Sequence, residues 1–552
     1  MLSDIAAGIV ARLCGSRAHP LMHPVAARRW ISETSRLDAD ERLADLLVHI
    51  NEFNAAPRLS TTSLDAFAVI DDAATRALRA MTESYLAGNR TANKSMLKRI
   101  EDAARSLGAT YELFLRGHKA GRPALRKPEQ LAHVLLGMVR YRNVQNRVRL
   151  FRYEEPQPVA WQATNALYRY AMANNLHRLP IRTAHRDAKS ATIESEYAVL
   201  LLVARLASGS FTAQEIEHAT TLLDEHQDKL RLVSDEPAHA TFALELDSGA
   251  GLVSAHGIHV TDRTLFLDPE PLFAQLRKRM DEIAAEDSGD VLARKIRIAW
   301  LERLLAHWVP DRKVVPRRAD RHATDTHIAL VPGLHNIHRE LMAEMENAGE
   351  FWDTLIRTGR WRIVESSALD CRIQFENESA DQYPVGALVS IRKEAATDWQ
   401  AGVVRRVKRF EGNRIELGVE LVAREVKAIR LWPEIGERTH PALPLGPVTP
   451  MLPPDPSAMV ALYLPSTGAI PPAPARALIL RHSDYKPGLI GYYVAGDTRV
   501  TLKLGDAIEI GRGWVWTTFT VEGRTPETGP PEDGLPQGIT TQLPVRARTE
   551  LP

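Results

Sequence analysis

Residues 361–422 carry four short runs in which apolar and polar side chains are mixed in strand-like patterns: Trp361-Arg-Ile-Val-Glu365-Ser-Ser367, Val385-Gly386-Ala-Leu-Val, Trp399-Gln-Ala-Gly402-Val-Val and Glu416-Leu-Gly418-Val-Glu-Leu-Val. Around the last run, apolar residues fill every second position from Ile415 to Leu421. This period of two is typical of a strand with one buried face. Glycines punctuate the stretch, as the turns of a small barrel require. Residues 361–422 therefore predict a small antiparallel β-barrel.

An arginine-rich segment, Arg317-Arg318-Ala-Asp-Arg321, precedes this β-rich stretch. Taken together, the two resemble the PilZ domain, a bacterial receptor module for cyclic di-GMP. The resemblance implies a six-stranded antiparallel barrel with an Arg-x-x-x-Arg motif ahead of it. Arg317 and Arg321 match that motif, and Arg318 is an additional candidate contact. Guanidinium groups suit this ligand because they bind phosphate in bidentate fashion and also reach the guanine edge.

The second family motif, Asp/Asn-x-Ser-x-x-Gly on the barrel surface, is matched with departures. Ser367 is retained, whereas Glu365 replaces Asp/Asn and Asp370 replaces Gly. By resemblance, Glu365 and Ser367 would contact the guanine base. Asp370 adds a side chain and a negative charge near an anionic ligand, and two like charges ~4 Å apart repel by about 1 to 4 kcal/mol. Two alternatives follow: a barrel that binds cyclic di-GMP through these residues, or a degenerate barrel that binds none.

The chain as a whole predicts an α+β multidomain protein. Residues 1–311 read as a helical scaffold of one or two subdomains, with some β structure near 241–266. We expect residues 312–440 to form the PilZ-like barrel, with an inserted helix at about 333–357. We expect a proline-rich linker at 441–456, a small β-rich unit at 457–522 and a disordered tail at 523–552.

The helical prediction rests on periodicity and end signals. One face of a helix is traced by apolar residues three and four apart: Leu97, Ile100, Ala104, Leu107, Tyr111 and Phe114. Thr212 and Glu215 form a capping box that opens another helix. The segment Arg147-Val-Arg-Leu-Phe-Arg-Tyr153 resembles an element found upstream of PilZ domains in larger proteobacterial proteins.

Composition limits the classes of partner. The net charge of the 552 residues is +1, which gives no electrostatic argument for a nucleic acid polymer or an anionic membrane. Cys14 and Cys371 are the only cysteines, so no disulfide framework is indicated. No window approaches the ~20 apolar residues of a spanning helix. We therefore expect a cytoplasmic protein without membrane insertion.

Motifs for catalysis and metal binding are not evident. The sequence lacks a Gly-x-x-x-x-Gly-Lys-Ser/Thr loop, a Gly-x-Ser-x-Gly elbow and a His-Glu-x-x-His helix. The paired histidines at 256 and 259, and at 335 and 338, read as surface or packing residues rather than metal ligands. Those at 19 and 23 are each followed by proline, which argues against a rigid helical pair. We expect no catalytic residues, no metal and no cofactor beyond the candidate ligand cyclic di-GMP.

The leading hypothesis is a bacterial signalling protein, a cytoplasmic cyclic di-GMP-responsive receptor or adaptor that acts on an unidentified protein partner. By resemblance, it would function in motility, adhesion or biofilm control. In this hypothesis the arginine segment orders over the ligand and changes how the barrel meets the helices. The alternative is a degenerate PilZ scaffold that works through protein interactions alone, and a hydrolase in the helical region is a more remote third hypothesis.

Overall fold

The computed structural model describes residues 19–526, apart from residues 89–92, 123–124, 183–189, 208, 237–241, 257, 287–290, 309–321, 345–360, 377–382, 395, 411–413, 435–457, 467–469, 471–475 and 496–497. The chain divides into two compact units. The first comprises Met1–Ala329, Ile356–Ala387 and Val403–Leu421. The second comprises Leu330–Leu355, Leu388–Gly402 and Val422–Pro552.

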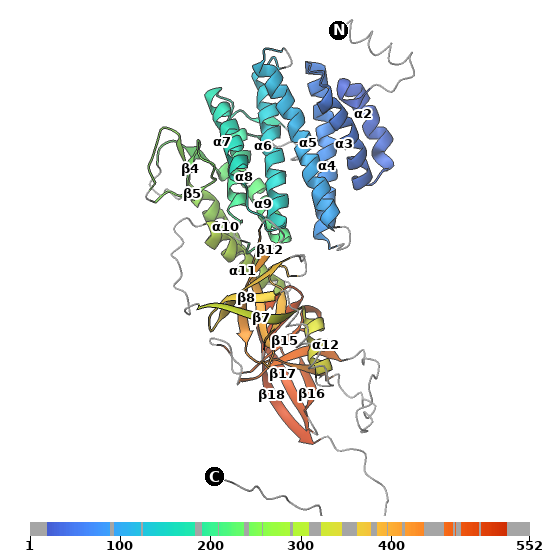
Figure 1. The fold of residues 1–552 in the computed structure, drawn as a ribbon, viewed down its shortest axis with the longest axis vertical. Coiled ribbons are helices and arrows are strands. Elements are labelled where there is room, and N and C mark those ends of the chain that lie inside the picture. The colour runs from blue at the N-terminus through green and yellow to red at the C-terminus, as the bar shows by residue number, and fades with distance from the viewer. Residues whose placement is uncertain are drawn as a thin grey trace, which may run out of the picture. The chain divides into compact units, whose positions relative to one another are not determined.

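The first unit opens with a series of helices, drawn from blue to green in Figure 1. They are α2 (Pro24–Glu33), α3 (Ala39–Ala55), α4 (Thr61–Leu86), α5 (Asn93–Lys119), α6 (Pro128–Phe151), α7 (Pro158–Ala173), α8 (Ile193–Ala204), α9 (Ala213–Glu225), α10 (Glu270–Ala284) and α11 (Val291–Trp308). Helices α2 to α6 lie side by side (Figure 1). The predicted helical region is therefore confirmed.

Two sequence signals account for how these helices begin and pack. The apolar face predicted between Leu97 and Phe114 lies on α5, and each of its members is at most 5% exposed. The capping box predicted for Thr212 and Glu215 opens α9: the Thr212 hydroxyl accepts from the Glu215 amide at 3.2 Å, and the Glu215 carboxylate accepts from the Thr212 amide at 2.8 Å. Both amides would otherwise lack partners at the helix end.

Short strands interrupt the helices. A four-stranded sheet has the order β3-β6-β4-β5, formed by β3 (Leu232–Val233), β4 (Phe242–Glu245), β5 (Val253–Ser254) and β6 (Thr264–Leu267). A second, two-stranded sheet pairs β1 (Ile181–Arg182) with β2 (Ser190–Ala191). Strands β4 to β6 occupy the range in which the sequence indicated β structure between helices.

The C-terminal half begins with a closed six-stranded barrel of order β10-β11-β12-β9-β8-β7. Its strands are β7 (His322–Pro332), β8 (Trp361–Ser366), β9 (Asp370–Glu376), β10 (Leu388–Lys393), β11 (Gln400–Arg409) and β12 (Arg414–Ala423). Ile415, Leu417 and Val419 on β12 are at most 1% exposed, whereas the alternate residues Glu416, Gly418 and Glu420 are only partly buried. The period-two pattern therefore reports the inner and outer faces of the barrel, and the predicted six-stranded fold is confirmed.

A second closed six-stranded barrel follows, with the order β13-β14-β15-β18-β17-β16. It consists of β13 (Lys427–Pro433), β14 (Met459–Leu464), β15 (Ala477–Arg481), β16 (Ile490–Ala495), β17 (Thr498–Gly511) and β18 (Trp514–Pro526). The small β-rich unit expected at 457–522 is thus part of a complete barrel. Its first strand, β13, comes from the range assigned to the PilZ-like barrel. The long β17–β18 hairpin is visible at the red end of Figure 1.

The end of β18 corrects the expected start of the disordered tail. Residues 523–526 continue the strand, because Thr525 and Pro526 pair with Arg499 and Thr498 of β17. Cross-strand partners supply the order that a composition rich in Pro, Gly and Thr does not predict. The rest of the expected tail, and the expected linker at 441–456, lie outside the described residues.

Helix α12 (Leu334–Glu344) lies at the start of the range predicted for the inserted helix, and residues 345–360 are not among those described. His338 on α12 is buried, and its Nε2–H donates to the carbonyl oxygen of Ile429 on β13 at 3.0 Å. Burial lowers the pKa of His338, which keeps the ring neutral. His338 thus packs helix against strand, as one of the two interpretations of the histidine pair expected.

No helix among the described residues is long and apolar enough to cross a membrane.

Candidate ligand site on the first barrel

The β8–β9 turn of the first barrel is built around Ser367. Its hydroxyl oxygen accepts from the amides of Leu369 at 3.1 Å and Asp370 at 3.0 Å, and its proton is donated to Asp370 Oδ1 at 2.8 Å. The Ser367 amide donates to the carbonyl of Asp370 at 2.8 Å, which closes the turn. A serine side chain that bonds to the backbone two and three residues ahead is a common device for fixing a tight turn.

Asp370 takes part in this turn. From the sequence we expected its carboxylate to repel an anionic ligand. In the structure, one oxygen of this carboxylate accepts a hydrogen bond from the Ser367 hydroxyl. The charge remains, because a serine hydroxyl does not neutralise a carboxylate. The side chain nevertheless stabilises the same turn that carries the second motif.

Glu365 lies on β8, next to Arg372 on β9. The two residues are paired in register, and Arg372 Nε is 3.3 Å from Glu365 Oε2. Arg372 also places Nη1 3.7 Å from Glu416 Oε2 on β12. The guanidinium therefore lies between two carboxylates on the outer face of β8, β9 and β12. Since the Arg372 side chain remains 42% exposed, it offers N–H donors at the surface beside Glu365.

Arg372 was not among the predicted site residues, although a signal for it was present. In the run from Asp370 to Phe375, apolar residues alternate with polar ones, and the alternation places Arg372 on the same face as Glu365 once β8 and β9 pair. The sequence alone did not reveal Arg372 because the register of the β8–β9 hairpin is a property of the folded barrel.

The arginines of the first motif, Arg317, Arg318 and Arg321, lie outside the described residues. Of the second motif, the structure joins Ser367 to Asp370 in the turn and places Glu365 beside Arg372 on the adjoining strands. The contacts of the arginines remain a prediction.

Within the first unit, the helical region contacts strand β11 of this barrel. The amide of Val407 donates to the carbonyl of Gly209 at 2.9 Å, and the amide of Arg409 donates to the carbonyl of Tyr153 at 3.3 Å. Between them, Lys408 Nζ is 2.7 Å from Glu155 Oε1. Two amides that are two residues apart lie on the same side of a strand. The helical region thus bonds to an edge of β11 through its backbone.

Tyr153 has an unusual backbone at this contact. Its φ is 61°, in the left-handed region, where it ends α6; the next amide, of Glu154, donates back to the carbonyl of Arg149 at 3.0 Å. Glycine is the usual residue at such a helix end. A tyrosine here supplies a side chain as well: the Val385 amide approaches its hydroxyl oxygen at 3.4 Å. The strained position therefore joins α6 to the barrel at two points.

At the same contact, Gly209 lies too close to β11 to carry a side chain. Its φ is +71°, and an added Cβ would lie 2.0 Å from the carbonyl oxygen of Val407. No side chain fits there without moving the strand. A backbone approach this close is a reason for glycine that no local sequence pattern reveals.

Comparison with known families gives two matches. Residues 25–238 match the model for the N-terminal domain of the cyclic-di-GMP receptor FimW, and residues 344–427 match the model for its middle PilZ domain. Together the matches span more than half of the chain. The chain belongs to the FimW family of cyclic-di-GMP receptors. The PilZ domain predicted in the C-terminal half is thereby confirmed, and no curated protein matches the chain significantly.

The two FimW matches include the residues of the candidate site and of the β11 contact. The N-terminal match contains Tyr153 and Gly209. The PilZ match contains Glu365 and Ser367, and also the β11 residues that Tyr153 and Gly209 contact. The PilZ match begins at residue 344, after the arginine segment.

Proposed function

We propose that this chain is a signalling receptor that binds cyclic di-GMP at the β8–β9 turn of its PilZ barrel. The observation that carries the proposal is the turn itself: Glu365 and Arg372 lie side by side on the outer face of a PilZ barrel, next to the turn fixed by Ser367. A carboxylate accepts from the N1–H and N2–H groups of guanine, and a guanidinium donates to phosphate. A hydrogen-bond acceptor for guanine, Glu365, and a donor for phosphate, Arg372, therefore lie side by side.

In this proposal Arg317, Arg318 and Arg321 bind the phosphates and guanine edges, as the family motif implies. Glu365 binds a guanine, and Arg372 offsets the charge of Glu365 and contacts a phosphate. Ser367 has a positioning role, since its single proton is already donated to Asp370. The receptor needs no catalytic step, so cyclic di-GMP should be recovered unchanged after incubation with the protein.

The signal would pass from the barrel to the helices through β11. The Tyr153 and Gly209 contacts are made by backbone groups, so a small shift of β11 must move or break them. The ligand can change this equilibrium only by as much as its affinity differs between the two arrangements. We propose that the helical region then presents a changed surface to a protein partner in the cytoplasm, in the control of motility or biofilm formation.

A thermal-shift comparison tests the proposed ligand. Cyclic di-GMP should raise the melting temperature, by a free energy equivalent to about 2.7 kcal/mol at a hundredfold excess over Kd. Cyclic di-AMP, which has the same phosphates and different base edges, should give a much smaller shift. Equal shifts with both dinucleotides, or none with either, would contradict recognition of guanine.

A degenerate barrel is the second candidate function, and one observation favours it. The Ser367 hydroxyl and an Asp370 oxygen are bonded to each other, and Glu365 already faces Arg372. A turn whose polar groups are satisfied internally is a stable surface without a ligand. The absence of any cyclic di-GMP shift would select this alternative, an interaction scaffold.

Replacing Asp370 with asparagine separates the charge of this residue from its role in the turn. Asparagine keeps an oxygen that accepts from Ser367 and loses the negative charge. We expect the affinity for cyclic di-GMP to rise by about threefold to tenfold, because a like charge at ~4 Å repels by about 1 kcal/mol or more. Calorimetric titration measures the change. Asp262→Asn, the same replacement at an exposed position of the helical region, should leave the affinity unchanged.

A further inference from the structure

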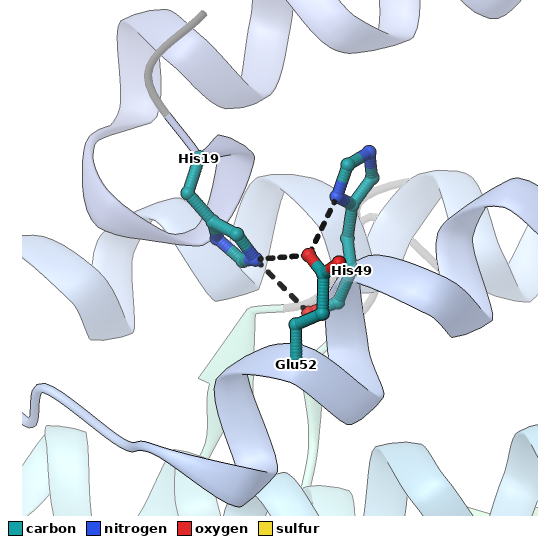
Figure 2. Close-up of side chains that lie close together, drawn as sticks. All are labelled: His19, His49 and Glu52. Atoms are coloured by element: carbon teal, nitrogen blue, oxygen red, sulfur yellow. Dashed lines mark hydrogen bonds and ion pairs between the residues drawn. The ribbon is translucent and has the colours of Figure 1, made fainter.

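Three side chains near the start of the helical region converge away from the barrel site. His19, His49 and Glu52 point toward one another (Figure 2), and one ligand atom from each lies within 4.8 Å of the others. Glu52 Oε2 is 3.6 Å from His19 Nε2 and 3.5 Å from His49 Nδ1. The two histidines are 30 positions apart in sequence, which explains why pairs of neighbouring histidines did not reveal the cluster.

The backbone and the surrounding rings fix these positions. His49 and Glu52 are three residues apart on α3, so they share one face of the helix. His19 immediately precedes Pro20 of the short helix η1 (Pro20–Met22). The His19 ring stacks on Phe53, with 6.4 Å between ring centroids, and Trp30 meets the edge of His49 at 6.3 Å. Packing on both rings limits their motion.

One ring nitrogen of the cluster, His49 Nδ1, lacks a hydrogen bond with any of the described residues. His49 Nδ1 is buried, and its contact is with Glu52 Oε2 at 3.5 Å. A buried polar atom without a hydrogen bond is unusual and requires an explanation. An ion bound between the three side chains would supply it.

We propose that His19, His49 and Glu52 bind a divalent transition metal ion, with zinc as the best match. Two imidazole nitrogens and one carboxylate oxygen are a common zinc donor set, with bonds of ~2.0–2.2 Å. Tetrahedral geometry then separates ligand atoms by roughly 3.3–3.5 Å, as follows from those bond lengths. The two measured separations of 3.5 and 3.6 Å are already close to this value. Glu52 is 59% exposed, which leaves a side open for entry and for a fourth ligand such as water.

The proton positions define what metal binding changes. His19 Nδ1 accepts from the amide of Leu21 at 3.2 Å, so the neutral ring carries its proton on Nε2, which donates to the His49 carbonyl at 3.1 Å. Coordination through Nε2 moves that proton to Nδ1 and gives up both hydrogen bonds. The start of η1 is therefore expected to loosen as the metal binds.

Titration of the chelator-treated full chain with zinc chloride tests this site without cyclic di-GMP. We expect one ion per chain, and at least tenfold weaker binding in His49→Ala and in Glu52→Gln. His23→Ala is the matched control, because His23 also caps a helix through Nδ1 but lies outside the cluster. It should bind zinc like the parent.

Substitution with cobalt(II) gives a second readout that does not depend on affinity. The parent and His23→Ala should show the intense visible absorption of a tetrahedral cobalt site, and His49→Ala should not. Far-ultraviolet circular dichroism confirms that each variant is folded. Equal zinc affinity and equal cobalt spectra in the parent and in His49→Ala would overturn the proposal, as would the absence of binding by the parent.

Discussion

Replacing both Arg317 and Arg321 with alanine is expected to weaken cyclic di-GMP binding by at least a hundredfold. Hydrogen bonds to charged groups contribute about 1.5–3 kcal/mol each, so removing two arginine–phosphate interactions together costs about 3–6 kcal/mol. At 1.4 kcal/mol per factor of ten, this corresponds to roughly a hundredfold to ten-thousandfold increase in Kd. Calorimetric titration of the parent and the double variant measures it.

The control removes the same charge elsewhere. Arg76 and Arg79 are exposed on α4, and their replacement with alanine lowers the net charge by the same amount. This variant should bind like the parent, because long-range attraction between exposed charges is screened by salt within about 10 Å. A Kd for the Arg317/Arg321 variant within threefold of the parent would remove these arginines from the site.

Replacing Gly209 with valine is expected to break the contact between the helical region and β11. The new Cβ would lie 2.0 Å from the Val407 carbonyl oxygen, and valine is strained at a φ of +71°. Backbone strain of this kind costs about 1–3 kcal/mol, and the clash adds to it. We expect the free energy of unfolding to fall by at least about 2 kcal/mol, as measured by urea denaturation.

Gly121→Val separates strain from clash. Gly121 has a φ of +75°, and an added Cβ would meet nothing within 4 Å. This variant should lose only the strain contribution and keep the contact at β11. Limited proteolysis should therefore cleave the Gly209→Val protein faster around residues 153–155 and 207–210, and the Gly121→Val protein at the parental rate. Equal destabilisation and equal cleavage in the two variants would show that the β11 contact contributes nothing.

Much of the fold was predictable because helices and strands with one buried face produce a periodic pattern of apolar residues in the local sequence. The face of α5 and the alternation on β12 each report a repeated environment that neighbouring residues share. Strand β13 was harder to assign, since an isolated run such as Lys427–Pro433 suits either of two adjacent barrels. Its partners, β14 and β16, lie more than 25 residues later in the chain, and only that pairing decides to which barrel it belongs.

The candidate site divides in the same way. The second motif was recognisable from Ser367 and its neighbours, because the residues that form a turn are adjacent in sequence. Arg372 emerged only from the register of β8 and β9. The contacts of Tyr153 and Gly209 with β11 join residues some 200 or more positions apart, so no local pattern could indicate them.

Hydrogen exchange with and without cyclic di-GMP tests the central claim most directly, because it locates the ligand on the full chain. We predict slower exchange in peptides that cover residues 312–322 and 365–372, and a change at the β11 contact around residue 407. Unchanged exchange in both of the first two segments at saturating ligand, or protection confined to the second barrel, would contradict binding between the arginine segment and the β8–β9 turn.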